Sequence, residues 1–236
     1  MVTSVVEPVE ANLIQWPEAA RVDRVIPKER LYAEASAGAA LKQRFVDEVQ
    51  RVRWAYKLGE ESLLLAPGQT VTEIQVFVLD LKGSGLDNSV LTSIDKAIPS
   101  QIVFELRRED GLWTEQAMAA AYKHAGGKPK GADYFRTGWI SADEPRVPLP
   151  AALDMDGLYS QLLGRLLPHP IRPAEELSDA LDRMGRVRRL TREVAALEKK
   201  LRTEPQLNRK IEIRRQIKER AAVLTELTAP VPSNKD

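Results

Sequence analysis

The stretch Val71-Thr-Glu-Ile-Gln-Val-Phe-Val-Leu-Asp-Leu81 decides how this chain of 236 residues folds. Both of its faces are apolar, since Ile74, Val76 and Val78 alternate along it with Phe77, Leu79 and Leu81. A strand that is apolar on both faces has to be covered on both faces. The sequence therefore predicts that this segment is a central strand of a sheet.

Further strands and helices are predicted on either side of this strand. Upstream, the helical spacing of Leu41, Phe45 and Val49 predicts a helix from Ala39, and alternation then predicts a strand that ends near Leu58. Downstream, we expect a helix from Asp87 or Asn88 to about Ala97, and strands over Ile102–Leu106, Leu112–Lys123 and Tyr134–Ile140. This order predicts an α+β fold with a mixed or mainly antiparallel sheet of about five strands and packed helices.

The chain divides into five predicted segments. Residues 1–20 form an N-terminal arm, in which Trp16-Pro17 is an anchoring point, and residues 21–142 form the α+β sheet domain. Residues 143–173 are a proline-rich linker with a short helix, residues 174–228 are a basic helical hairpin, and residues 229–236 are a disordered tail.

Apolar residues recur at intervals of three or four along the C-terminal segment, as in a coiled coil. The first run is Leu177, Leu181, Met184, Val187, Leu190, Val194, Leu197 and Leu201, and the second is Leu207, Ile211, Arg214, Ile217, Ala221 and Leu224. Two helices of roughly 43 and 33 Å are expected to fold back as an αα-hairpin. The alternative is one kinked helix that pairs with a second chain and makes a homodimer.

Charge is unevenly distributed, although the net charge is only +1. Residues 172–228 contain 15 Lys/Arg and 10 Asp/Glu, whereas residues 1–171 contain 19 and 23. This asymmetry indicates an anionic partner for the C-terminal segment, although a solvated helical hairpin would give the same counts.

Composition excludes several classes of site. The absence of cysteine rules out disulfides, thiolate zinc sites and cysteine nucleophiles. The two histidines, His124 and His169, have no second ligand at metal-binding spacing, so we expect no metal and no cofactor. No apolar run approaches the roughly 20 residues that span a bilayer. We therefore expect a cytoplasmic protein that does not enter a membrane.

A family resemblance is carried by three segments. They are Glu73-Ile-Gln-Val-Phe77 with Leu81-Lys82, Ile94-Asp-Lys-Ala-Ile-Pro99 leading into Val103-Phe-Glu-Leu106, and Gln206-Leu-Asn-Arg-Lys210, to which Val25-Ile-Pro-Lys28 is added. Together they resemble a prokaryotic family, domain of unknown function 4391, from about Trp16 to Leu227. The sequence departs from the family at Ser100-Gln101, where a bulkier or histidine-containing pair is expected.

What the resemblance implies is a context rather than a reaction. Members of the family are commonly encountered beside helicase, DNA methyltransferase and restriction-type genes. The resemblance therefore implies an accessory role in DNA restriction or phage defence, with a helicase or a DNA methyltransferase as partner.

The strand end at Asp80-Leu-Lys82 has the local form of a PD-(D/E)xK nuclease motif. In such enzymes carboxylates hold Mg²⁺ and a lysine helps to activate water. Glu73 and Gln75 offer a variant pair, and Glu48 on the preceding helix offers a further acid. No Pro-Asp element lies where the first acid belongs, and strand ends often carry Asp and Lys for solubility. We predict no catalytic residue, and a Mg²⁺-dependent nuclease is the alternative.

Basic side chains crowd both C-terminal helices and are the predicted partner-binding residues. They are Arg186, Arg188, Arg189 and Arg192 on the first helix and Arg209, Lys210, Arg214 and Arg215 on the second, and a further contact surface is predicted at Asp95 and Lys96. Like charges on adjacent turns repel each other. Acids across the hairpin, an acidic protein or nucleic-acid phosphate could each compensate the repulsion, and phosphate binding would fall steeply with salt.

The favoured function is a non-catalytic accessory subunit that assembles with a larger DNA-acting machine. The sheet domain would be its docking body and the hairpin its arm. A stand-alone nucleic-acid-binding protein is a further alternative.

Overall fold

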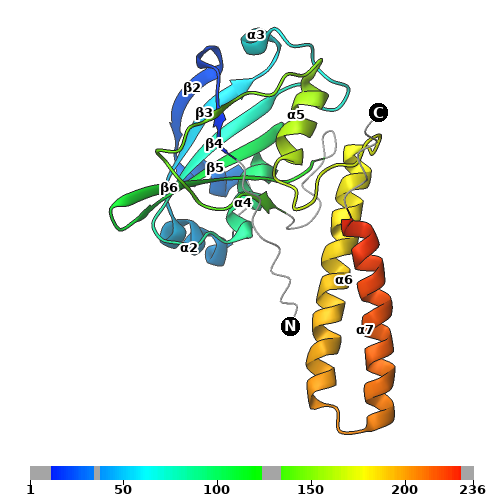
Figure 1. The fold of residues 1–236 in the computed structure, drawn as a ribbon. Coiled ribbons are helices and arrows are strands. Elements are labelled where there is room, and N and C mark those ends of the chain that lie inside the picture. Colours follow the sequence, from blue (N-terminus) through cyan, green and yellow to red (C-terminus); the bar gives the residue numbers. More distant parts are fainter. Residues whose placement is uncertain (1–11, 35–37, 124–133, 230–236) are drawn as a thin grey trace. The chain divides into compact units, whose positions relative to one another are not determined.

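The structure, a computed structural model, describes residues 12–34, 38–123 and 134–229 (Figure 1). They form two compact units, a sheet unit that ends at Leu166 and a helical unit that begins at Leu167. The predicted α+β class is confirmed, as is the pairing of the two C-terminal helices. Most of the predicted arm, His124 and nearly all of the predicted tail lie outside the described residues.

The sheet unit is built on a seven-stranded sheet with the order β2-β3-β4-β5-β6-β7, in which β8 also pairs with β6. The strands are β2 (Arg21–Ile26), β3 (Val49–Leu58), β4 (Ile74–Leu81), β5 (Gln101–Asp110), β6 (Trp113–Ala120), β7 (Phe135–Arg136) and β8 (Ile140–Ser141). β4 and β5 run parallel, and the other paired strands run antiparallel. Because parallel neighbours need a crossover, the helix α4 (Asn88–Ala97) connects β4 to β5.

Three helices cover the first face of the sheet: α1 (Lys28–Glu34), α2 (Ala39–Glu48) and α4. Leu31 of α1 and Phe45 of α2 pack in one core with Phe104 of β5. Asp87 fixes where α4 begins, because its carboxylate accepts a hydrogen bond from the backbone N–H of Ser89 at 2.8 Å. The first face therefore holds the larger helical layer.

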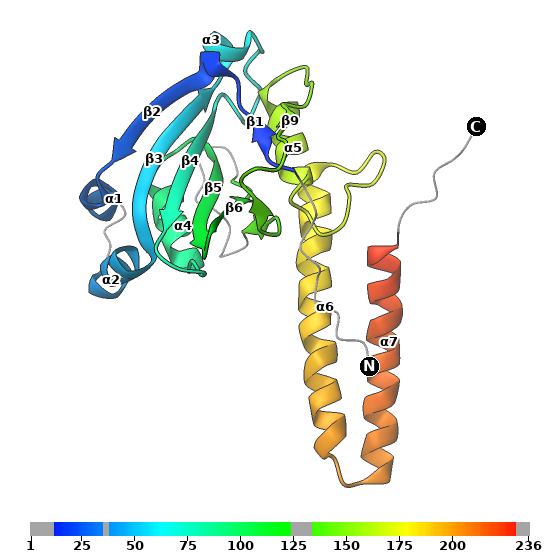
Figure 2. The ribbon, with the colours of Figure 1, turned by 60° about the vertical axis from the view of Figure 1, so that its left-hand side comes forward.

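A smaller layer covers part of the second face. β1 (Ile14–Gln15) pairs in parallel with β9 (Val147–Pro148), and the helices η1 (Glu18–Ala20), α3 (Glu60–Leu63) and α5 (Met155–Gly164) complete the unit. Figure 2 shows β1, β9 and α5 beside the sheet. The Tyr159 hydroxyl of α5 donates to the carbonyl of Ala121 at 2.7 Å, which ties the helix to the end of β6. β4 is thus almost wholly buried, as its sequence predicts.

The sheet unit extends further along the chain than the predicted segments do. Leu13, Ile14 and Trp16 are buried, so the described end of the predicted arm belongs to the fold. The first part of the predicted linker belongs to it as well, because α5 buries Leu158 and Leu162. β2 lies at the start of the predicted sheet domain. It was not predicted as a strand, because its charged residues interrupt the apolar pattern.

The predicted strand over Tyr134–Ile140 is interrupted. Thr137 makes two contacts with Met118 of β6: its backbone N–H donates to the Met118 carbonyl, and its hydroxyl accepts from the Met118 N–H, both at 3.0 Å. The hydroxyl takes the place of a backbone acceptor, so the regular ladder breaks and two short strands, β7 and β8, result.

The helical unit consists of α6 (Leu177–Thr203) and α7 (Leu207–Thr228), of 27 and 22 residues. The two helices lie side by side in both views (Figures 1 and 2). The predicted hairpin within one chain is therefore correct, and the single kinked helix is not.

Two arginines fasten the base of the hairpin. Arg183 is only 7% exposed and donates to both carboxylate oxygens of Glu175 at 2.7 Å, and to the carbonyl of Leu227 at 3.2 Å. Arg172 donates to the carbonyl of Glu226 at 2.7 Å. These carbonyls end α7, where a helix has unpaired acceptors and partial negative charge. The hydrogen bonds from Arg183 also lower the pKa of Glu175.

One carboxylate of α5 holds the loop before β4. Asp156 accepts hydrogen bonds from the backbone N–H groups of Gln69 and Val71, both at 2.7 Å, and from the Thr70 hydroxyl at 2.6 Å. Burial opposes the ionisation of Asp156, but these hydrogen bonds outweigh it and the pKa of Asp156 is lowered. Gly68 lies against this carboxylate, since a Cβ on Gly68 would stand 2.3 Å from the Asp156 Cγ.

We expect Gly68→Ala to destabilise the protein, because the new methyl group displaces the Asp156 carboxylate from its donors. The loss in unfolding free energy should be about 1–3 kcal/mol, measured by urea denaturation. Gly83→Ala is the matched control, because a Cβ there meets nothing within 4 Å. Equal urea midpoints for the two variants would show that the Asp156 carboxylate does not hold this loop.

Candidate functional sites

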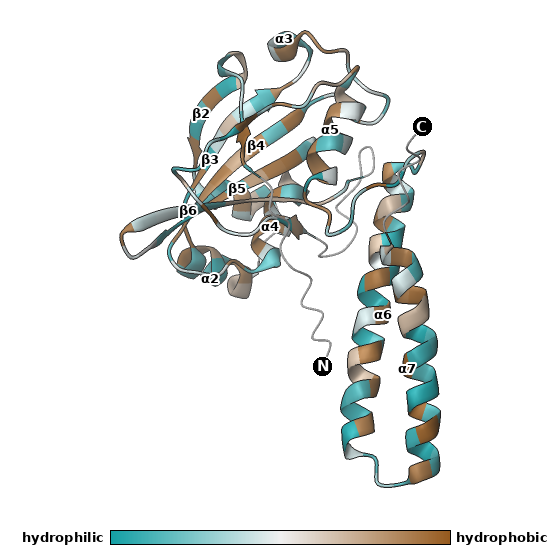
Figure 3. Ribbon diagram, in the orientation of Figure 1, coloured by the Kyte–Doolittle hydropathy of each residue, from teal (hydrophilic) through white to brown (hydrophobic). Residues whose placement is uncertain are grey.

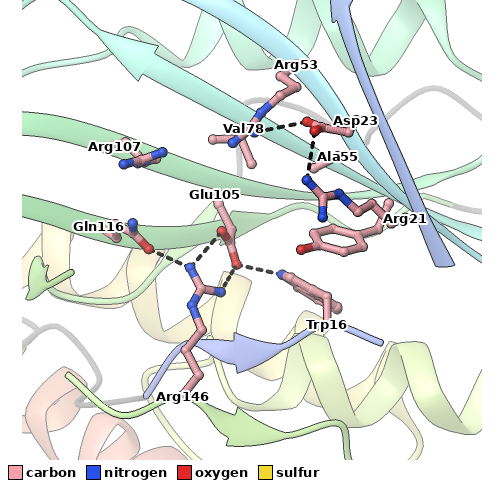
Figure 4. Close-up of a pocket in the computed structure, with 11 residues that line it drawn as sticks. Trp16, Arg21, Asp23, Arg53, Ala55, Val78, Glu105, Arg107, Gln116 and Arg146 are labelled. Carbon is pink, nitrogen blue, oxygen red and sulfur yellow. Dashed lines mark hydrogen bonds and ion pairs between the residues drawn. The ribbon is translucent and has the colours of Figure 1, made fainter. Parts of the chain in front are cut away.

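A cavity of about 200 Å³ lies on the second face of the sheet unit. It is lined by Trp16, Arg21, Asp23, Arg53, Ala55, Tyr56, Val78, Glu105, Arg107, Gln116 and Arg146 (Figure 4). Four of these residues are arginines and two are carboxylates, so the lining carries a formal charge of +2. None of these lining residues was predicted from the sequence as a binding residue, so the cavity is a new candidate site.

Glu105 is the buried centre of one wall of this cavity. It is 3% exposed, and its two oxygens accept hydrogen bonds from Arg146 at 2.7 and 3.1 Å. The Trp16 indole N–H donates to the same carboxylate at 2.6 Å, and Arg146 also donates to Gln116 at 2.6 Å. Burial works to lower the pKa of Arg146, but the hydrogen bonds to Glu105 outweigh it and that pKa is raised. Both oxygens of the buried Glu105 carboxylate thus have hydrogen-bond donors.

Asp23, the second carboxylate, lies in a bulge of β2. The register between β2 and β3 shifts between Arg21 and Arg24, and Asp23 has a φ of 54°. Aspartate tolerates this left-handed conformation better than most residues. Its carboxylate accepts from Arg21 and from Arg53, both at 3.0 Å. These hydrogen bonds, above all the one from Arg21, lower the pKa of Asp23.

A buried lysine ties the end of α4 to the end of β6. Lys123 is 1% exposed, and its Nζ donates to the carbonyls of Ile98 and Ser100, both at 2.7 Å. It also lies 3.1 Å from the Asp95 carboxylate, which accepts a hydrogen bond from the Tyr134 hydroxyl. Burial raises the pKa of Asp95 and lowers the pKa of Lys123. The group has the contacts of a structural clasp.

Asp95 and Lys96, predicted as a contact surface, have different environments. Asp95 is 3% exposed and already bound by Lys123 and Tyr134, so its side chain is not available at a surface. Lys96 is exposed. The sequence prediction treated the two residues as one surface, but Asp95 lies among the buried residues of α4.

Each side chain of the nuclease alternative at this strand end is engaged by a structural partner. Asp80 is paired with Arg51 at 2.7 Å, and the Lys82 Nζ donates to the carbonyl of Val46 at 2.6 Å. The Glu48 carboxylate accepts from the backbone N–H of Asp87 at 2.7 Å. Within residues 12–34, 38–123 and 134–229, no three His, Asp or Glu side chains form a group that could hold a metal ion.

The variant pair Glu73 and Gln75 lies at the start of β4. Glu73 is ion-paired with Lys57 at 3.0 Å and accepts from Ser100 at 2.5 Å and from Gln75 at 2.7 Å. Burial opposes the ionisation of Glu73, but these hydrogen bonds prevail and its pKa is lowered. Gln101 is buried and donates to the carbonyl of Lys123 at 3.0 Å. The Ser100-Gln101 pair, at which the sequence departs from the family pattern, thus makes local structural contacts.

The hairpin exposes most of the predicted basic residues. Arg186, Arg189, Arg192, Arg209, Arg214 and Arg215 are exposed, and Arg188 and Lys210 are half-buried. Acids on the hairpin compensate part of the charge, since Glu212 pairs with Arg215 and Glu193 pairs with Arg220 of the other helix, both at 2.9 Å. Figure 3 shows hydrophobic positions spread among mostly hydrophilic ones on both helices.

The packed stripe of α7 agrees with the predicted seam at Ile217, Ala221 and Leu224 but not in the first half of the helix. Its less exposed positions include Ile213, Ile217, Arg220, Ala221, Leu224 and Leu227. Leu207 and Ile211, predicted in the seam, are 68% and 56% exposed. They begin a second line of residues at helical spacing, Leu207, Ile211, Arg214 and Lys218, which we call the outer stripe. Sequence spacing alone did not distinguish the two, because both stripes repeat at three and four residues.

The sequence profile of a family described as "Domain of unknown function (DUF4391)" matches residues 14–224. The chain belongs to the DUF4391 family. All the cavity residues and all the predicted basic residues of the hairpin lie within the DUF4391 match. No curated protein and no solved structure matched the chain.

No helix in the described part of this DUF4391 chain has both the length and the apolar character needed to cross a membrane. This agrees with the expectation from the sequence that no apolar run is long enough to span a bilayer.

Replacing Lys123 with Met should lower the unfolding free energy by about 3–5 kcal/mol, because the Asp95 charge stays buried without its partner. Chemical denaturation would measure the loss. Lys96→Met is the matched control, since Lys96 is exposed and follows Asp95 directly in the sequence, and it should change stability by less than about 0.5 kcal/mol. If Lys123→Met unfolds like the control, the clasp has no structural role.

Proposed function

We propose that this DUF4391 protein is a non-catalytic, cytoplasmic accessory subunit of a DNA-acting assembly, and that the hairpin attaches it to its partner. The observation that carries the proposal is the outer stripe of α7, where the exposed Leu207 and Ile211 continue into the exposed Arg214 and Lys218. An apolar pair flanked by positive charge suits a partner with an apolar groove and an acidic rim.

The hairpin has the form of an attachment arm. Its own packing uses the opposite side of α7, and its base is fastened by Arg172 and Arg183. The outer stripe is therefore not needed for the packing of the helical unit. Apolar residues that are exposed in this way are typical of surfaces that meet another protein.

The partner that we propose is a helicase or a DNA methyltransferase of a restriction or phage-defence system. This choice rests on the gene context expected for the DUF4391 family. The exposed arginines elsewhere on the hairpin, such as Arg189 and Arg192, support a location close to nucleic acid.

The local contacts of the candidate catalytic residues support a non-catalytic role. Asp80 is held by Arg51, and Lys82 satisfies a carbonyl at the end of α2. Each residue thus has a structural partner that a metal-dependent reaction would have to displace.

The double variant Leu207→Glu/Ile211→Glu should bind the helicase or methyltransferase encoded beside its gene at least about 100-fold more weakly, because two apolar anchors are lost. The affinity of the purified proteins would be measured by biolayer interferometry, and circular dichroism would check that the helices persist.

Leu153→Glu is the matched control, because Leu153 is 95% exposed in the sheet unit. It should leave the affinity unchanged. Wild-type affinity of the double variant, or a partner that binds neither protein, would contradict the proposed attachment.

A further inference from the structure

Two arginines of the sheet cavity have donors without an acceptor. The Nε atoms of Arg53 and Arg107 are buried and make no hydrogen bond within the described residues. Among those residues Arg107 also has no ion-pair partner. Buried donors in folded proteins are nearly always satisfied, by protein or by something bound. The two guanidinium groups, which line the cavity, therefore have hydrogen-bond donors that the sheet unit itself does not use.

The two carboxylates of the cavity are already engaged elsewhere. Asp23 accepts from Arg21 and Arg53, and Glu105 accepts from Arg146 and from Trp16. Neither carboxylate compensates the charge of Arg107. The lining keeps its formal charge of +2, which favours an anion.

Strand register brings the two unsatisfied arginines to the same side of the sheet. Arg53 of β3 lies opposite Val78 of β4, and Val78 lies opposite Glu105, two residues before Arg107 on β5. Side chains two apart on a strand share a face, so Arg53 and Arg107 flank β4 from either side. Their Cα atoms lie roughly 12 Å apart, two strand spacings across the sheet and two residues along it. Two long side chains can close this distance around a small ligand. Figure 4 shows Arg53 close to Val78 and Arg107 farther away on the sheet.

The size of the cavity limits the ligand. Its volume of about 200 Å³ is below the roughly 300–1,000 Å³ of sites that enclose a drug-sized molecule. It has room for one compact group and not for a whole nucleotide. Guanidinium groups recognise phosphate through paired donors, and a phosphate monoester carries about −1.5 to −2 charges at pH 7. The negative charge of a phosphate monoester is therefore close in size to the +2 charge of the lining.

We propose that the cavity binds a phosphate monoester, with Arg53 and Arg107 donating to its oxygens and the rest of the ligand lying outside. Inorganic phosphate, a nucleoside monophosphate and the 5′ end of a DNA strand share this chemistry. The proposal concerns the sheet unit alone, so it is independent of the outer stripe and of the partner that the hairpin binds.

Isothermal titration calorimetry on the full chain at low salt tests the proposal with four ligands. They are inorganic phosphate, adenosine monophosphate, a 5′-phosphorylated DNA oligonucleotide and the same oligonucleotide with a 5′ hydroxyl. The three ligands with a terminal phosphate should bind, and the hydroxyl oligonucleotide should bind at least about tenfold more weakly than its phosphorylated form. The tightest of the three identifies the source of the phosphate.

Arg107→Gln should weaken phosphate binding at least about tenfold. It should fold normally, because no hydrogen bond of the Arg107 side chain is lost within the described residues. Arg107→Lys keeps the charge without the paired donors, so its affinity for phosphate should lie between those of the wild type and Arg107→Gln. Arg51→Gln is the matched control, since Arg51 pairs with Asp80 on the same face and does not line the cavity. It should change the affinity less than about twofold.

Three results would overturn the proposal. One is no measurable binding of any phosphate-bearing ligand at millimolar concentration. Another is equal affinity for the phosphorylated and hydroxyl oligonucleotides, which would place the contact on backbone phosphodiesters. The third is an equal loss of affinity in Arg107→Gln and Arg51→Gln, which would indicate general attraction between charges.

Discussion

β4 is apolar on both faces, and the layers of the sheet unit follow from that constraint. Its first face packs under α1, α2 and α4, and part of its second face lies under the layer that contains α5, β1 and β9. Along the second face the strand changes from the buried Ile74 and Val76 to Val78, which lines the cavity, and then to the ion-paired Asp80. The cavity therefore lies where the apolar part of the strand gives way to its polar end.

Arginine has three different roles in this chain, and only the contacts distinguish them. Arg183 and Arg146 are held by carboxylates and carbonyls and act as structural fasteners. Arg189 is exposed on the hairpin. Arg107 has a buried donor without an acceptor among the described residues. Charge counts treat these residues alike, although only an arginine of the third kind has a buried donor left for a ligand.

The sequence predicted the features that depend on local periodicity. These are the central strand β4, the helix α4, for which Asp87 was one of two candidate caps, and the approximate lengths of α6 and α7. It did not predict β2, because an edge strand with alternating charges lacks an apolar pattern. It also placed the first half of the α7 seam on the exposed stripe, since helical spacing is the same for a packed and an exposed line of residues.

The cavity could not be predicted because it is assembled from distant parts of the chain. Glu105, Arg146 and Trp16 are separated by 41 and 89 positions and meet only after the sheet has formed. Trp16 beside Pro17 was the one local signal, as an anchoring point. Lys123 was treated as the end of a strand, and nothing in its neighbours indicates that its charge is buried against Asp95.

The bulge at Asp23 has a further consequence for the behaviour of the protein in a crowded cell. β2 is the first strand of the sheet, so one of its edges has no neighbouring strand within the described fold. A regular, flat edge of this kind invites pairing with another molecule. The left-handed residue and the register shift interrupt the edge, and Arg21, Asp23 and Arg24 make it charged. The irregularity that shapes the cavity thereby also protects the protein against self-association through its open sheet edge.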